Sequence, residues 1–211
     1  MSDIRGFVQQ DTLQAVAEGT YAALQMSKRG ELRTVDFISE MILEGRGYQV
    51  RAGTITTHLT GDVEITDTAA EMCADAGSGA TIIPVEFQIH IEALGGTVPI
   101  VAAKAVATAS TAGTAFVPLP LYRGGSAAAS TARVQAAGAV TVTAELATTT
   151  LRLFSATIVS VDNPAWHWNP SYVSAVLPGP SCFYVQVAAT TTGPNYYAHF
   201  NYLELPTENV S

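Results

Sequence analysis

Apolar and polar residues alternate with a period of two along most of the chain after residue 32. The clearest example is residues 81–94, TIIPVEFQIHIEAL, which end at the turn pair Gly95–Gly96. Successive side chains of a strand point to opposite faces, so this segment predicts a half-buried strand. Its apolar face would consist of Val85, Phe87, Ile89 and Ile91, and its polar face of Glu86, Gln88, His90 and Glu92.

Further short runs have the same strand pattern and are separated by clusters of Gly, Pro, Ser and Thr. They are residues 48–59, 62–66, 98–110, 114–124, 139–147, 149–161, 182–190 and 195–205. Residues 34–43 fit either a strand or one helical turn, and residues 67–80 predict a loop with a helical turn at its start. Short strands spaced by roughly ten residues, without long helical patterns between them, predict an all-β antiparallel jelly roll or β-sandwich.

The first 30 residues have a different pattern. Asp11 is a possible helix cap, and Leu13 and Val16 follow at helical spacing, but Gly19 interrupts the stripe. We therefore predict an N-terminal arm or short helix over residues 1–30, followed by a jelly-roll β-sandwich domain over residues 31–211. An arm that cannot bury its own apolar face is expected to bury it on a neighbour.

The composition changes this picture by predicting a partner. Charged residues make up 13% of the 211 residues, while hydrophobic residues make up 48%. The charged share is about half of the ~25% that is typical of globular proteins. Protein–protein contacts are depleted in Lys and Glu, so a neighbouring subunit is the simplest cover for such a surface.

Charge and hydropathy argue against two other classes of partner. The net charge is −8, and Lys28 and Lys104 are the only lysines, whereas nucleic-acid binding depends on clustered Lys and Arg. No apolar run approaches the ~20 residues of a membrane span, and the start lacks the pattern of a secretion signal. We expect synthesis in the cytosol. Cys73 and Cys182 lie far apart in sequence, which favours two free, largely buried thiols.

The polar face of residues 85–93 allows two interpretations. Two carboxylates and an imidazole suggest a metal site, with His58 or His199 as a third ligand from elsewhere. However, ligand atoms must lie within ~2–2.6 Å of the ion, and strand residues two apart are spaced by ~6.6–7 Å. We favour a solvated or intersubunit face, and predict no metal and no cofactor.

Aromatic residues in the last third are further interface candidates, namely Trp166, Trp168, Tyr196 and Tyr197. The segment PAWHWNP, residues 164–170, predicts an aromatic loop that would stack on sugar rings in a carbohydrate- or receptor-binding module. The alternative is that a tryptophan closes one end of the sandwich and the tyrosines line a subunit contact, where such side chains are enriched. We favour the subunit contact.

Catalytic motifs are missing from the sequence. It contains no G-x-S-x-G elbow, no H-E-x-x-H, no Walker loop, no G-x-G-x-x-G and no paired C-x-x-C. We predict that the protein is not an enzyme. A jelly-roll hydrolase or a cupin-like metal enzyme is the alternative in that class.

Three segments together resemble a family of small structural proteins of tailed bacteriophages. They are GRGYQVRAGTITT (45–57), GSGATIIPVEFQIHIEAL (77–94) and LPGPSCFYVQVAATTTGPNYYAHFNYLELP (177–206). The shared pattern is a Gly-flanked strand ending in T-x-T, an apolar strand after a small-residue loop, and two last strands joined by an A-A-T-T…P turn. The Ala/Thr-rich residues 100–150 and the N-terminal arm depart from it.

This resemblance implies a jelly-roll virion protein, a homotrimer of the cement or decoration type or a component of a head or tail vertex. Its partners would be itself and the major capsid protein or another virion protein. Glu86, Gln88, His90 and Glu92 would then contact water or a neighbouring subunit, and no chemistry would be required of them.

Overall fold

The computed structural model describes residues 36–135, 139–145, 150–158, 165–168 and 175–209. The predicted arm over residues 1–30 lies outside these ranges and stays a prediction. Residues 41–211 form one compact unit that contains every strand of the described chain. Helix α1 (Phe37–Leu43) and the 3-10 turn η2 (Thr207–Asn209) flank the strands. In the described ranges no helix is long and apolar enough to cross a membrane.

The short helix α1 resolves the ambiguity of residues 34–43. The Ser39 amide donates a hydrogen bond of 3.0 Å to Asp36 Oδ1, as at a capped helix start. A hydrogen bond from the Ser39 hydroxyl and, secondarily, this amide bond lower the pKa of Asp36. The helix ends before Gly45, which has a φ of 77°.

The strands divide into two large sheets and one small sheet. They are β1 (Gly47–Ala52), β2 (Leu59–Thr60), β3 (Ala69–Ala70), β4 (Met72–Ala76), β5 (Ala80–Ala93), β6 (Thr97–Val106), β7 (Thr111–Ala112), β8 (Thr114–Phe116), β9 (Leu119–Pro120), β10 (Thr131–Val134), β11 (Val140–Thr141), β12 (Leu151–Thr157), β13 (Ala165–Trp168), β14 (Leu177–Pro178), β15 (Ser181–Thr190) and β16 (Asn195–Pro206).

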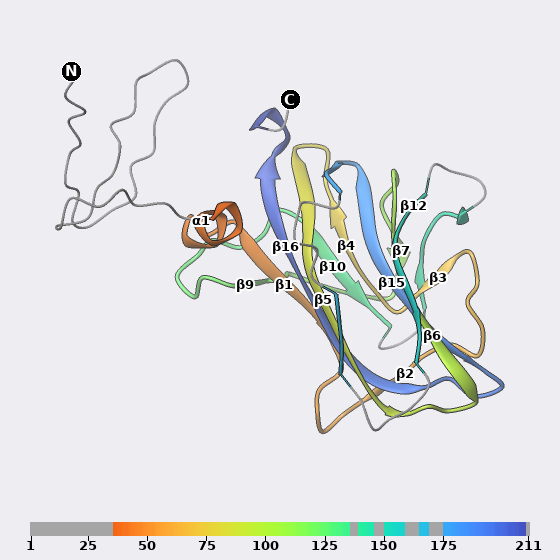
Figure 1. The fold of residues 1–211 in the computed structure, drawn as a ribbon. Coiled ribbons are helices and arrows are strands. Elements are labelled where there is room, and N and C mark those ends of the chain that lie inside the picture. Colours follow the sequence, from red (N-terminus) through yellow and green to blue (C-terminus); the bar gives the residue numbers. More distant parts are fainter. Residues whose placement is uncertain (1–35, 136–138, 146–149, 159–164, 169–174, 210–211) are drawn as a thin grey trace, which may run out of the picture. The chain divides into compact units, whose positions relative to one another are not determined.

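The order of the strands is that of a jelly roll. The seven-stranded sheet runs β13-β5-β16-β1-β9, with β14 paired to β5 and β2 to β16, and the six-stranded sheet runs β12-β6-β15-β4-β10-β8. The chain changes sheet from β1 to β4, from β5 to β6, from β12 to β13 and from β15 to β16 (Figure 1). All pairings between these strands are antiparallel, so the predicted all-β antiparallel jelly-roll sandwich is confirmed.

The core lies between the two large sheets and is rich in aromatic rings. Phe183 of β15 packs edge-on against Phe200 of β16 at a centroid distance of 4.8 Å. The largest fully buried side chains of this layer are Tyr196, Tyr202, Phe87, Phe183, Phe200, Met72, Ile82, Ile89 and Ile91. Burial of one large apolar side chain contributes about 1.5–3 kcal/mol, so this layer dominates the stability of the sandwich.

A third layer covers the other face of the six-stranded sheet. Strands β3, β11 and β7 form a small sheet of their own. A second apolar cluster joins it to β4, β6 and β15, and consists of Ala70, Cys73, Val106, Val140, Val142, Cys182 and Tyr184. The chain between β6 and β12, in which the sequence departs from the phage pattern, supplies β7 to β11.

The third layer explains why the loop predicted over residues 67–80 is wrong. This segment contains β3 and β4, and all five residues of β4 are buried. Strand β4 lies between β15 and β10, with apolar layers on both of its faces. A strand that is buried on both faces needs no alternation of apolar and polar residues, and small residues such as Ala74 fit there.

Other predicted strands are wrong or interrupted. The run 114–124 is divided into β8 of the six-stranded sheet and β9 of the seven-stranded sheet. Residues 62–66 form no strand; Asp62 makes an isolated bridge with Ala188, and Val63 is exposed. The run 48–59 is divided at Gly53, which has a φ of 70° and precedes a tight turn over residues 54–57. A positive φ is readily adopted by glycine but not by residues with a Cβ, so strand β1 ends there.

Candidate interaction surfaces

The predicted polar side chains of β5 lie on the outer face of the seven-stranded sheet. Here β5, β16 and β1 are neighbours, and polar side chains form rows across them. In the first row, Asn201 Nδ2 donates to Glu86 Oε2 over 2.7 Å, and Gln49 Nε2 donates to Asn201 Oδ1 over 3.0 Å. The row therefore links three strands by side chains as well as by backbone bonds.

The other rows bring histidines together. His199 lies between Gln88 and Arg51 in register. In the next row, the His90 ring stacks on Tyr197 with centroids 4.8 Å apart, and His58 Nδ1 lies 2.9 Å from Glu92 Oε2. Glu86, Gln88 and His90 are half-buried, and Glu92 is exposed. The structure thus brings these four predicted residues to one face.

This face does not form the metal site that the spacing suggested. His58 reaches Glu92, but Glu86 is engaged by Asn201 instead of sharing a centre with them. In the ranges that the structure describes, the group of three converging His, Cys, Asp or Glu side chains is Cys73, Asp75 and Cys182, on another sheet. The two cysteines are free and buried, which confirms that prediction.

Two predicted positions need correction. Tyr196 was an interface candidate, but its ring is fully buried between the sheets and cannot contact a neighbouring subunit. Val85 is only half-buried instead of facing the core, because the register of β5 and β16 shifts between Pro84 and Glu86. Such a bulge leaves one residue outside the alternation. Tyr197, the neighbour of Tyr196, stays on the outer face.

The predicted aromatic loop is a strand. Residues 165–168 form β13, which pairs with β5 and places Trp166 opposite Ile89 and Trp168 opposite Phe87. The side chains of Trp166 and Trp168 lie outside the described part of the chain, so their roles as interface candidates stay predictions. Strand β13 is the edge of the seven-stranded sheet next to the polar rows.

One side of the sandwich has an exposed apolar surface that the sequence analysis did not identify. The chain passes from β8 to β9 at this side, where each strand is the edge of its sheet. Val117, Leu119 and Tyr122 are 58%, 39% and 50% exposed, and we call them the β9 patch. Leu119 lies in edge strand β9, and such edges are sites of pairing with other chains.

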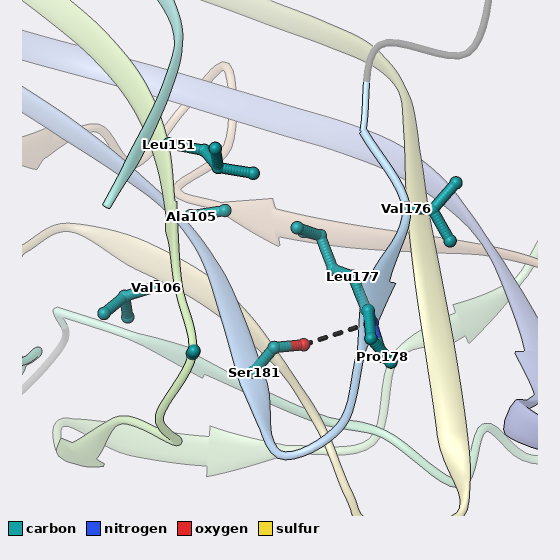
Figure 2. A pocket seen from close by; sticks show the side chains of 8 residues that line it. Ala105, Val106, Leu151, Val176, Leu177, Pro178 and Ser181 are labelled. Atoms are coloured by element: carbon teal, nitrogen blue, oxygen red, sulfur yellow. Dashed lines mark hydrogen bonds between the residues drawn. The ribbon is translucent and has the colours of Figure 1, made fainter. Parts of the chain in front are cut away.

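The opposite side of the sandwich has a shallow apolar pocket of about 250 Å³ (Figure 2). Residues of β6 and β12 from one sheet and of β14 from the other line it, and Ser181 Oγ donates to the Leu177 carbonyl beside it over 3.1 Å. Leu151 and Val176 at its rim are 48% and 42% exposed. We call these two residues and the pocket the β12 patch.

Buried charges also escaped the sequence analysis. Lys104, which interrupts an apolar run, is buried, and its Nζ lies 2.6 Å from Glu145 Oε2; Arg152 binds the other carboxylate oxygen. The hydrogen bond from Lys104 lowers the pKa of Glu145. Glu71 is almost fully buried, and this burial raises its pKa well above the ordinary value of 4.5. No local sequence pattern predicts either site, because Lys104 and Glu145, and Glu71 and its partner Val187, are distant in sequence.

Comparisons with known proteins leave the function open. No family model matches the chain, and no curated protein matches it. A chain in the crystal structure of the T13 IBDV viral particle is matched with 9% sequence identity and a TM-score of 0.13. The match covers 95% of this chain, which spans 46% of the length of the other. A likeness this weak carries no argument.

Proposed function

We propose that this protein is a structural protein of a tailed-bacteriophage particle, a decoration or cement protein that stabilises the head as a homotrimer. The observation that carries the proposal is the pair of apolar patches at the two sides of the sandwich. Monomeric proteins rarely leave large apolar patches uncovered. The composition and the resemblance of the sequence to phage structural proteins support the same proposal.

The position of the patches favours a ring. The β9 patch and the β12 patch lie at opposite ends of the strand order. A contact between two different patches is heterologous, and heterologous contacts close into rings when the rotation per subunit allows it. In a trimer, each β9 patch would cover the β12 patch of the next copy. The predicted N-terminal arm would contact the capsid, and the outer polar face around His90 and Tyr197 would remain uncovered by the ring.

Jelly rolls also occur in lectins and cupins, so the fold alone decides nothing about function. Two features make an interaction role the better proposal. Packed side chains such as Phe87, Phe183 and Phe200 occupy the space between the sheets. On the outer face of the seven-stranded sheet, Glu86 of β5 is already bonded to Asn201, which is bonded to Gln49.

The native mass measured by light scattering tests the ring. The 22.1 kDa chain should elute as a trimer, and Leu119→Lys or Leu151→Lys should each yield monomers, because a buried ammonium is not tolerated in an apolar contact. We expect the association constant to fall at least about tenfold, which is 1.4 kcal/mol. Val63→Lys, at an exposed position outside both patches, is the matched control.

Mixing the two variants distinguishes the ring from other assemblies. The Leu119→Lys subunit keeps its β12 patch, and the Leu151→Lys subunit keeps its β9 patch. A heterologous contact therefore predicts that the mixture forms heterodimers, although each variant alone is monomeric. A wild-type monomer, or a mixture that stays monomeric, would contradict the ring, and a glycan-array signal from such a monomer would favour the carbohydrate-binding alternative.

The role in the particle needs its own test. Purified wild-type protein should sediment with phage heads that lack it and raise their temperature of disruption. Mass spectrometry should find the protein in purified virions. Its absence from virions would overturn the proposed location whatever its oligomeric state.

A further inference from the structure

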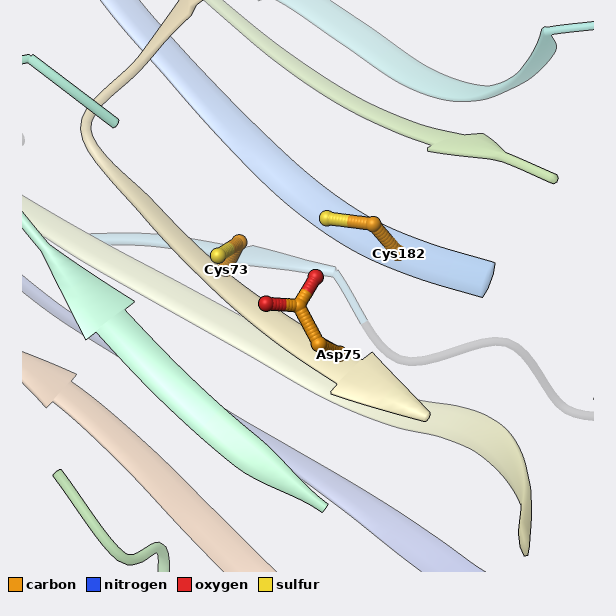
Figure 3. Close-up of side chains that lie close together, drawn as sticks. All are labelled: Cys73, Asp75 and Cys182. Carbon is orange, nitrogen blue, oxygen red and sulfur yellow. The ribbon is translucent and has the colours of Figure 1, made fainter. Parts of the chain in front are cut away.

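We propose that Cys73, Asp75 and Cys182 form a binding site for a zinc-like divalent metal ion, between the six-stranded sheet and the third layer. The inference is independent of the proposed function. One ligating atom of each side chain lies within 4.8 Å of those of the other two, and all three residues are buried. Figure 3 shows the three side chains close together, with Cys73 and Asp75 on β4 and Cys182 on the neighbouring β15.

The strand register places the three ligands. Cys182 lies directly opposite Asp75 in the β4–β15 pair, and Cys73 lies opposite Tyr184. Cys73 and Asp75 are two apart in β4, so they share a face of the sheet. Two thiolates and one carboxylate from adjacent strands form a set of S and O ligands that Zn²⁺ accepts, and they leave one of its four tetrahedral positions open.

Neighbouring groups hold the carboxylate in place. The Ser110 amide donates to Asp75 Oδ1 over 2.8 Å, and Ser110 Oγ donates to Asp75 Oδ2 over 2.6 Å. The same Oγ lies 3.1 Å from Cys73 Sγ, so the Ser110 hydroxyl lies beside two of the three proposed ligands. Hydrogen bonds that orient a ligating carboxylate typically raise metal affinity 10- to 100-fold.

The charge of the site also fits a divalent cation. Two thiolates and a carboxylate carry three negative charges, which a divalent ion and one guanidinium would balance. Arg133 Nε lies 3.4 Å from Asp75 Oδ2, and this buried nitrogen has no hydrogen-bond partner among the described residues. The surrounding apolar cluster, which includes Val106 and Val140, would exclude water. The attraction between the ion and its charged ligands is stronger in such surroundings, because the effective dielectric constant is lower there than in water.

The same geometry disfavours a disulfide between the two thiols. Cys73 and Cys182 are diagonal neighbours in the strand pair, and diagonal positions are about 7–8 Å apart. Disulfides usually require Cα atoms within 4.4–6.8 Å of each other. Binding of the ion would release the two thiol protons to solvent without any oxidation.

Cobalt(II) and zinc(II), added to reduced, chelator-treated full-length protein, test this proposal. We expect one ion per chain by elemental analysis, and thiolate-to-cobalt charge-transfer absorption, which only sulfur ligation produces. Cys73→Ser and Cys182→Ser should each remove that absorption. Asp75→Asn should weaken binding at least tenfold, and Ser110→Ala should weaken it 10- to 100-fold. Zinc should also raise the melting temperature of the wild type.

Three outcomes would overturn the proposal. The first is that no cobalt absorption appears and zinc leaves the melting temperature unchanged. The second is that bound metal persists in the Cys73→Ser/Cys182→Ser double variant, which would place it on other residues such as the histidines of the outer face. The third is that, after mild oxidation, the protein has lost the mass of two hydrogen atoms and has no thiol left to titrate, which would show that Cys73 and Cys182 form a disulfide. Circular dichroism of each variant checks that it is folded.

Discussion

At the scale of single residues, Glu71 is the most unusual group of the described chain. Its carboxylate accepts hydrogen bonds from the Val187 amide over 2.8 Å and from the Asp62 amide over 3.4 Å. Burial is the main cause of its raised pKa, and the Asp62 carboxylate adds to it. Because burial disfavours the charged form of a carboxyl group, an ionised Glu71 destabilises the folded state at neutral pH. The Tyr196 hydroxyl is a second buried polar group, and it has no hydrogen-bond partner in the described ranges.

The pH dependence of unfolding should reveal this cost. Because the folded pKa of Glu71 is raised, its contribution to stability is complete below its unfolded pKa and is lost as the pH rises through the folded pKa. We therefore compare the free energy of unfolding of the wild type with that of Glu71→Gln. The difference, wild type minus variant, should fall as the pH rises above about 4.5, by at most about 1.4 kcal/mol per pH unit.

Urea unfolding at a series of pH values measures this difference. Any change in hydrogen bonding that glutamine causes is a constant offset, so the slope is the informative quantity. The exposed Glu64 offers the matched control, and Glu64→Gln should follow the wild-type profile. A difference between wild type and Glu71→Gln that does not vary with pH would contradict the assignment.

At the scale of elements, two turns that connect the two large sheets are in close contact. The β5–β6 turn contains Gly95 and Gly96, and the Gly96 amide donates to the Thr192 carbonyl in the β15–β16 turn over 2.8 Å. A Cβ at Gly96 would overlap the carbonyl oxygen of Thr190. The glycine thus allows the backbones of the two connections to approach each other where a side chain would separate them.

Alanine substitution at this contact should destabilise the protein. We expect Gly96→Ala to lower the free energy of unfolding by about 1–3 kcal/mol or more, because backbone atoms must move to admit the methyl group. Gly77→Ala is the matched control, since a Cβ there meets no atom within 4 Å. Both changes reduce the entropy of the unfolded chain similarly. Equal stabilities of the two variants in chemical denaturation would contradict the close contact.

At the scale of the whole molecule, folding and assembly should be separable. Residues 41–211 contain both large sheets and the core between them, while the proposed arm precedes them. Deleting residues 1–25 should leave the midpoint of thermal unfolding unchanged, because every strand of the described ranges begins at or after Gly47. The truncated protein should no longer sediment with phage heads. Undiminished sedimentation would show that the arm is not the contact with the capsid.

The sequence by itself determined the fold class and the clearest strands. Strand β5 and its turn at Gly95–Gly96 could be predicted because a strand with one wet face alternates with period two, which is a local property. The same pattern placed Glu86, Gln88, His90 and Glu92 on one face. Free, buried thiols followed from two cysteines that lie far apart in sequence.

Only the tertiary structure decided which segments are covered on both sides and which distant residues meet. Strand β4 lacks alternation because the core and the third layer bury both of its faces. Tyr196 is in the core because it shares a face of β16 with Ala198 and Phe200, and the other large sheet covers that face. The cluster of Cys73, Asp75 and Cys182 and the Lys104–Glu145 pair depend on pairings between strands. Such pairings are contacts of long sequence separation, which a local pattern does not encode.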